Sequence, residues 1–302
     1  MTAPPLPAAA GASAREVPVA PGRARRTWRL LRAHPLALAG SAALAVLAAL
    51  ALLAPWIAPY PPDAIDLRGI AAPPSPAHAF GTDELGRDEL SRLLYGGRVS
   101  LLVGAGSTAI AVAIGATVGA LAGFRGGRVD AVLMRGVDLL LSLPAIFVLL
   151  ILTSVHRGSA LDLVLYIGLF GWMGMARLVR GQMLSLRERE FVAAARSLGA
   201  SGTRIVLHHL VPHAAPPLIV AATLGVGSAM LLEAAVDFLG FGISADTPTW
   251  GSLLYNAELY LTTEPLLAIA PGLLIAIAVM SVNLVGGALR DALDPHGAGA
   301  AR

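Results

Sequence analysis

The sequence predicts an all-α membrane protein with six transmembrane helices, and three observations lead to that class. First, 56% of the 302 residues are hydrophobic and only 14% are charged, whereas a soluble domain of this length needs more polar residues to cover its surface. Second, apolar runs of about 20 residues recur along the chain, which is the length a helix needs to cross the hydrocarbon core. Third, the arginines gather in alternate connections between these runs, as in a multi-pass topology.

Six apolar runs supply the predicted spans. The fourth is short and is bounded by Asp162 and Arg177, so its prediction depends on the agreement of the other five. The six predicted spans cover residues 36–57, 99–124, 139–155, 163–176, 214–232 and 265–289.

The first run is predicted to remain as a membrane anchor and not to act as a cleaved signal peptide. A Pro-, Ala- and Arg-rich stretch precedes it, and the run exceeds a typical signal core. The predicted organisation is a disordered tail over residues 1–35, a first helix over 36–58, a connecting segment over 59–98, a core with the other five spans over 99–289, and a second tail over 290–302.

The arginine distribution predicts that both termini face the cytoplasm, because basic residues concentrate on the inner side of a membrane. The segment over residues 59–98 is then extracytoplasmic, and the last outer loop, residues 237–264, contains no arginine. The inner-side arginines are Arg15, Arg23, Arg25, Arg26, Arg29, Arg32, Arg125, Arg128, Arg135, Arg177, Arg180, Arg187, Arg189, Arg196, Arg204, Arg290 and Arg302.

The chain contains no lysine and no cysteine, and both absences exclude chemistry. A Walker A loop needs a lysine to reach the terminal phosphates, so this chain cannot hydrolyse ATP by that mechanism alone. Without cysteine it has no disulfide, no thiol nucleophile and no thiolate metal site. No Gly-x-Ser-x-Gly or His-Glu-x-x-His pattern occurs either. We therefore predict no catalytic residue, no metal and no cofactor.

Small residues and prolines inside the spans suggest how the helices pack. Gly115, Gly119 and Gly123 recur every four residues, which lets two helix backbones approach closely in lipid. Pro144 and Pro271 lie inside the third and sixth spans, where each is expected to kink its helix. Helix packing is favoured over a gating hinge, because Gly and Pro are common in membrane helices.

The inner connection over residues 177–213 is long, polar and helix-prone. Good helix formers run from Glu190 to Gly199, and this glycine is suited to a C-terminal cap. Ser201 or Thr203 can begin a second short helix that runs to Pro212. Such an element, joined rigidly to two spans, is suited to receive movement from a motor. The alternative is an amphipathic helix lying in the headgroup layer.

The spacing within residues 190–212 resembles the "EAA" loop of binding-protein-dependent ABC importer permeases. In that loop Glu-Ala-Ala is followed after three residues by Gly, and after nine more by Ile-x-Leu-Pro. Ala193 stands here where the glutamate is expected, while His209 and Val211 replace the isoleucine and leucine. The resemblance implies coupling to an ATPase through Glu190, Ala194, Ala195, Gly199, Arg204 and Pro212.

Further segments resemble the second, "C"-type permease of the dipeptide, oligopeptide and nickel group. Two departures are Asp237, where serine is usual, and Gly287, where aspartate is common. The resemblance covers nearly the whole chain and implies an importer-permease (MetI-like) bundle with a cytoplasmic coupling helix. The matching segments are residues 80–88, 91–101, 237–242, 248–251 and 289–295.

The resemblance implies a permease subunit of an ATP-driven importer in the cell membrane, for di- or oligopeptides or a related small solute. Its implied partners are a homologous permease, two cytoplasmic ATPase subunits that bind the ATP, and an extracytoplasmic solute-binding protein. The alternative is a secondary transporter driven by an ion gradient, which predicts broken helices or carboxylates near the midplane and inverted repeats. The charged residues lie at the ends of the predicted spans and no clear repeat is present, so the importer is preferred.

Two polar clusters have metal-binding alternatives. The acidic residues of segment 83–89 lack the spacing of a calcium loop, so we expect them to cap a helix and to pair with Arg87 and Arg92. His209 and His213 are four residues apart, but Pro212 is expected to interrupt the helix between them, which disfavours a zinc site.

Two carboxylates lie at the edges of apolar spans, where charge is costly and function is the default hypothesis. For Asp138 we expect a structural pair with Arg135. For Glu233 two interpretations stay open: a residue of the transport pathway, or a side chain that reaches the outer surface.

Overall fold

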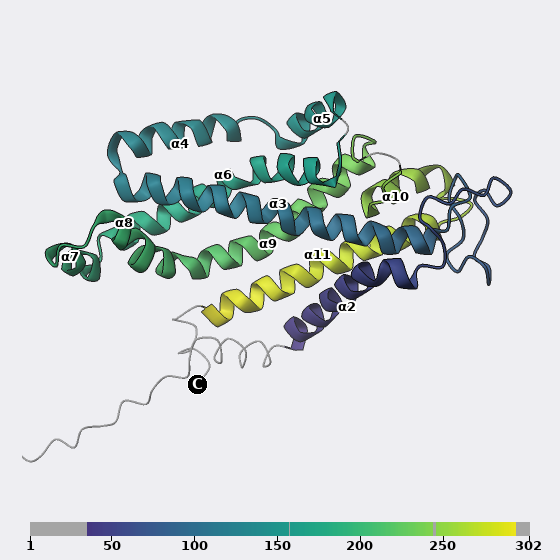
Figure 1. Ribbon diagram of the computed structural model, residues 1–302, viewed down its shortest axis with the longest axis horizontal. Coiled ribbons are helices and arrows are strands. Elements are labelled where there is room, and N and C mark those ends of the chain that lie inside the picture. Colours follow the sequence, from purple (N-terminus) through teal and green to yellow (C-terminus); the bar gives the residue numbers. More distant parts are fainter. Residues whose placement is uncertain (1–34, 157, 244–245, 294–302) are drawn as a thin grey trace, which may run out of the picture.

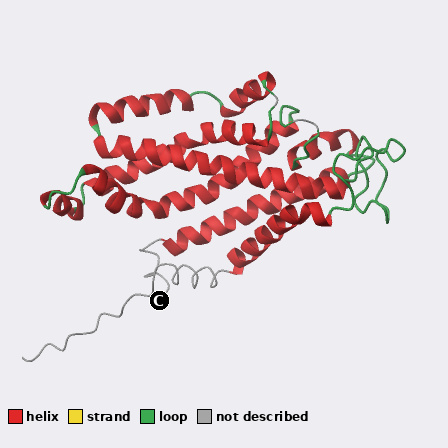
Figure 2. Ribbon diagram, viewed as in Figure 1, coloured by secondary structure: helices red, strands yellow, loops and turns green. Residues whose placement is uncertain are grey.

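The computed structural model describes residues 35–156, 158–243 and 246–293, and within these ranges it contains helices and loops but no strand (Figures 1 and 2). The predicted N-terminal tail, apart from Pro35, lies outside the described residues. So do Arg157 and the chain from residue 294 onward, which includes the end of the 289–295 motif.

In the described part of the chain, five helices are long and apolar enough to cross a membrane, and a bent pair of helices makes a sixth span when the two are counted as one. The short fourth run lies within a 28-residue helix, so its prediction is confirmed. The five single spans are α2 (Pro35–Ile57), α3 (Glu89–Arg125), α6 (Ala160–Arg187), α9 (Val211–Phe238) and α11 (Leu266–Leu293), and the bent pair is α4 (Gly127–Leu141) with α5 (Ala145–Val155).

The third span differs from its prediction, because it is broken and not merely kinked. α4 ends at Leu141, α5 begins at Ala145, and the two helices meet at 75°. Pro144 has no N–H group and disfavours helical backbone in the residue before it, so the helix ends just upstream. Pro271, by contrast, lies within the unbroken α11.

The glycine stripe of α3 is a packing face against α6. A methyl group at Gly119 would lie 2.8 Å from the Cβ atom of Val179, and one at Gly123 would lie 2.6 Å from the Cβ atom of Met183. These separations are too short for any larger side chain, so glycine is needed for the close approach of the two helices. The packing interpretation of the stripe is confirmed.

The bundle has two distinct ends. One end carries α7 (Glu190–Ser197) and α8 (Gly202–Ile205), and we call it the α7 end. The other carries residues 58–88 and α10 (Trp250–Ala257), and we call it the α10 end. α2 begins and α11 finishes toward the α7 end (Figure 1), so the described chain crosses the bundle an even number of times.

Candidate functional site

The segment over residues 190–212 forms a helix, a glycine cap and a second helix, as predicted. Gly199 has a φ of +79°, which a residue without a Cβ atom adopts at little cost. The N–H of Gly199 donates to the carbonyl of Arg196 (2.9 Å), and that of Ala200 donates to the carbonyl of Ala195 (3.0 Å). This is the Schellman pattern that ends a helix, so the predicted cap is confirmed.

The second helix does not stop at Pro212, which corrects the prediction. The side chain of Ser201 caps α8 by accepting from the Arg204 N–H (3.4 Å). The chain then passes through a π-helical turn, η1 (Val206–Leu210), directly into α9. Pro212 falls in the first turn of α9, where a missing N–H is tolerated. α8 is therefore continuous with a membrane span.

One of the histidines beside this turn takes part in helix packing. Nδ1 of His213 donates to the carbonyl of His209 (2.6 Å), and its ring stacks on Phe191 with 5.0 Å between the centroids. Among the described residues, no group of three His, Cys, Asp or Glu side chains could hold a metal ion. His213 instead contributes to the packing of α7 against α9.

One face of the segment is anchored in the bundle and the other is open. Val192, Ala195 and Ile205 are buried against side chains of α6, including Val179 and Met183. Ala195 is thus an anchoring residue, whereas the other predicted coupling residues lie on the open face. That face is made up of Glu190, Ala194, Gly199, Arg204 and Pro212, with Ala193 beside them.

Leu198 is part of this open face, and the sequence analysis did not single it out. Its surface is 88% exposed, at the turn between α7 and α8. A leucine beside a helix-capping glycine in a polar connection is the signal that could have identified it.

Two arginines of α6 hold α4 in place by ion pairs. Arg180 binds Asp130 through two nitrogens, at 2.5 and 2.7 Å. Asp138 pairs with Arg177 at 2.5 Å, and not with Arg135 as predicted. α6 lies beside α4, so Arg177 reaches Asp138 across the two helices and takes the place expected for Arg135.

The acidic segment at the α10 end behaves as predicted. Asp83 pairs with Arg87 (2.6 Å) and with Arg92 (3.2 Å), and Asp88 caps α3 by accepting from the Ser91 N–H (2.8 Å). These contacts stabilise the start of the longest helix in the described chain.

Glu233 lies in a buried polar network at the α10 end. It is 1% exposed, so the interpretation that it reaches the outer surface is wrong. The Ser100 hydroxyl of α3 donates to Glu233 (2.9 Å) and accepts from the backbone N–H of Trp250 (3.2 Å). Asp237 accepts from the hydroxyl of Thr249. These hydrogen bonds join α3, α9 and α10.

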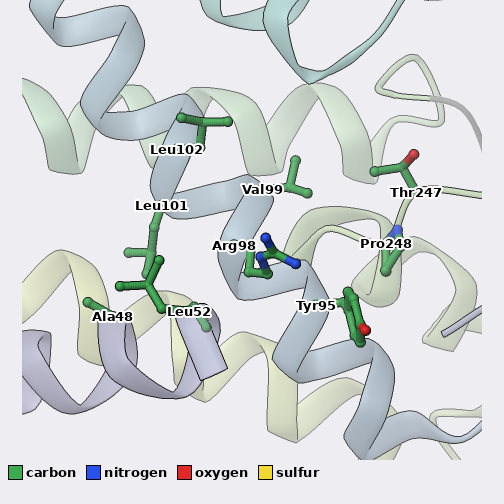
Figure 3. A pocket seen from close by; sticks show the side chains of 10 residues that line it. Ala48, Leu52, Tyr95, Arg98, Val99, Leu101, Leu102, Thr247 and Pro248 are labelled. Carbon is green, nitrogen blue, oxygen red and sulfur yellow. The ribbon is translucent and has the colours of Figure 1, made fainter. Parts of the chain in front are cut away.

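A pocket of about 560 Å³ lies beside this network, between α2, α3 and the residues before α10 (Figure 3). Arg98 and Tyr95 of α3 line it, with the guanidinium carbon 5.9 Å from the ring centroid. In the described part of the chain no carboxylate lies within ion-pair distance of Arg98. The other lining residues are Ala48, Ala51, Leu52, Val99, Leu101, Leu102, Thr247 and Pro248. One cation among mainly apolar side chains suits an apolar group that carries a negative charge.

Comparison with known proteins identifies the family. Residues 115–297 match the model described as "Binding-protein-dependent transport system inner membrane component". The chain belongs to this family. Residues 22–74 of this permease match a second model, "N-terminal TM domain of oligopeptide transport permease C". The resemblance noted in the sequence is therefore confirmed.

Curated relatives agree with this assignment. A probable D,D-dipeptide transport system permease protein, DdpC, of Escherichia coli K12 is 37% identical over 91% of this chain and 92% of its own. The nickel transport system permease protein NikC of the same strain is 42% identical over 80% of this chain and 87% of its own. The oligopeptide transport system permease protein OppC of Mycobacterium bovis is 41% identical over 86% of this chain and 90% of its own.

Family membership decides between the two transport hypotheses. The broken third span is a feature that the secondary-transporter alternative predicted, but broken helices are not confined to that class. This permease is a multi-pass inner-membrane component of an ABC importer. It is not itself an enzyme and binds no cofactor, because ATP is used by partner ATPase subunits, and a substrate-binding protein completes the system.

Proposed function

We propose that this permease imports di- or oligopeptides or a related small solute as one half of a permease heterodimer. Its partners are a homologous permease, two cytoplasmic ATPase subunits and an extracytoplasmic solute-binding protein. The names of the relatives support this substrate class, since they specify dipeptide, oligopeptide and nickel transport.

The open face of the α7–α8 segment carries this proposal. Glu190, Ala194, Gly199, Arg204 and Pro212 form the contact surface for an ATPase, and Leu198 provides its apolar centre. The buried face, through Val192 and Ala195, transmits a push on this surface to α6 and α9. Ala193 is exposed but carries no charge, so Glu190 and Arg204 supply the polar contacts of the surface.

The α7 end faces the cytoplasm in this proposal, with both termini on the same side. The arginines beside the α3–α4 junction and along the end of α6 support this orientation, because basic residues concentrate on the inner side. The organisation that goes with it has a first helix over residues 36–58, an extracytoplasmic segment over 59–98 and a core over 99–289. The separate family matches to residues 22–74 and 115–297 support such a division.

Reconstitution in liposomes tests the proposal directly. The four membrane and ATPase subunits, with the binding protein outside, are expected to accumulate a labelled peptide only when ATP is present with the ATPases. The variant Leu198→Asp is expected to lower peptide-stimulated ATP hydrolysis, because it places a charge in an apolar contact. Uptake driven by a proton or sodium gradient without the ATPase subunits contradicts the proposal.

A further inference from the structure

The break between α4 and α5 lies at the depth of the bundle centre. Ala145, the first residue of α5, lines a cavity together with Ser107 and Thr108, which are in the middle of the 37-residue α3. The 15 residues of α4 extend about 22 Å from the α7 end. Figure 1 shows the break beside the central part of α3, well away from both ends of the bundle.

The backbone at this break is incompletely hydrogen-bonded. The N–H groups of Ser142 and Leu143 bond back to the last turn of α4. Among the described residues no donor reaches the carbonyl oxygens of Leu141, Ser142 and Leu143, and Pro144 provides no side-chain cap for the first turn of α5. Residues 141–144 are all exposed. Lipid chains cannot satisfy such groups, so irregular backbone at membrane depth lies against protein or water.

The ion pair between Asp138 and Arg177 lies within one helical turn of the break. The side chain of Asp138 is 56% exposed and that of Arg177 is 52% exposed, although both residues belong to membrane-spanning helices. Charged side chains in such helices face a water-filled cavity or another polar surface and not lipid. The ion pair and the break thus point independently to a polar environment on this side of the bundle.

Behind the break is a cavity of about 170 Å³. It is lined by the hydroxyl-bearing residues Ser107, Thr108 and Ser228, and by Ala145 at the break itself. The Ser107 and Thr108 hydroxyls donate to helix carbonyls, which leaves their oxygen lone pairs as acceptors. Most of the other lining residues are apolar, among them Ile167, Phe170 and Met175. The volume is several times the share of about 30 Å³ that one water molecule occupies in the liquid, so the cavity has room for water beside these three hydroxyl-bearing residues.

We propose that Asp138, residues 141–144 and Arg177 line the water-filled route along which the permease moves its solute. We call these residues the broken-span face. This inference rests on the proposed function and names residues of its pathway. The free carbonyl oxygens accept hydrogen bonds, so the face suits a solute with ammonium or amide N–H groups, as a short peptide has.

Single-cysteine labelling tests the inference, and because this chain has no native cysteine, the introduced thiol is the only one in this subunit. Labelling is read on the band of this subunit after electrophoresis. Ser142→Cys is made in the complete importer in membranes. Val46→Cys is the control, since Val46 is at the middle of α2 and 57% exposed on a helix without charged residues. A charged, membrane-impermeant thiosulfonate is applied from each side, with and without ATP and vanadate.

The thiol of the Ser142→Cys variant is expected to react about tenfold faster than that of Val46→Cys. The rate of its reaction is expected to change with the nucleotide state and to fall when peptide is added. Equal, slow reaction of the two variants in every state overturns the inference, provided that a membrane-permeant maleimide labels both. Protection of the thiol at position 142 together with its cross-linking to the partner permease also overturns it, because the face is then a subunit contact.

Peptide uptake by the same Ser142→Cys complex separates this inference from the proposed function. ATP-dependent uptake with an unreactive thiol at position 142 leaves the importer standing and removes only the pathway assignment. Uptake that needs no ATPase removes the proposed function itself.

Discussion

Carboxylates near the ends of two apolar helices, α9 and α4, lie in opposite environments in the two halves of the bundle. At the α10 end, Glu233 and Asp237 are buried and hydrogen-bonded to Ser100 and Thr249, so their polarity joins three helices. In the half toward the α7 end, Asp138 and Arg177 are half exposed, and the open face of the α7–α8 segment has no cover among the described residues. A carboxylate near the end of an apolar helix is therefore buried and joins helices in the half toward the α10 end, and lies at an accessible surface in the half toward the α7 end.

The largest expected effect is at the α10 end. Trp250 is fully buried, and its indole N–H donates to the carbonyl of Leu93 (3.0 Å). Trp250→Ala removes this packing and this hydrogen bond, so we expect a loss of about 3–5 kcal/mol in the free energy of unfolding. Denaturant titration in detergent measures it. Trp56→Ala, at a side chain that is 78% exposed, is the control, and equal losses for the two variants contradict the comparison.

Substitutions of Glu233 test whether its side chain only joins helices or also lines the transport pathway. Glu233→Ala leaves the Ser100 hydroxyl without its acceptor and opens a void, and we expect a loss of about 1–3 kcal/mol in the same titration. Glu233→Gln keeps an acceptor for Ser100 and is expected to retain peptide uptake. Loss of uptake in the glutamine variant, with folding intact, makes Glu233 a pathway residue and breaks the contrast between the two halves.

Gly199 tests whether the open surface at the α7 end depends on its cap. Gly199→Val forces a β-branched residue to a φ of +79°, at a cost of about 1–2 kcal/mol confined to the α7–α8 turn. No other atom lies within 4 Å of the added Cβ position, so the effect is one of backbone strain. We expect normal membrane insertion with reduced ATPase binding in a pull-down. Gly199→Asn, which tolerates this backbone conformation, is expected to retain binding.

The smallest expected effect is at the exposed ion pair. Asp138→Asn removes a half-exposed pair and is expected to change the free energy of unfolding by less than about 1 kcal/mol. Asp130→Asn, which breaks a bidentate pair with only 16% of the carboxylate side chain exposed, is expected to cost more. Thermal unfolding of both variants in detergent checks the order. A larger loss of stability from Asp138→Asn than from Asp130→Asn contradicts the view that the exposed ion pair contributes little to stability.

Much of the fold follows from local sequence patterns. Apolar run length predicted six spans, including the short fourth run, and the step of four between Gly115, Gly119 and Gly123 predicted a packing face. The helix formers before Gly199 predicted α7 and its cap. Each of these depends on residues within a few turns of one another. Two predictions were wrong: Asp138 pairs with Arg177 of α6, an element distant in sequence, and a π-helical turn next to Pro212 lets the helix continue past it.

The sequence by itself determined the membrane class, the positions of the apolar runs and the family to which the chain belongs, because hydropathy, helix caps and motif spacing are properties of contiguous residues. Only the tertiary structure decided that Glu233 is buried, that Leu198 is exposed on the α7–α8 segment and that the third apolar run is broken at the depth of the bundle centre. Burial and hydrogen-bond satisfaction depend on which helices lie beside a residue, and that arrangement is set by packing over the whole chain.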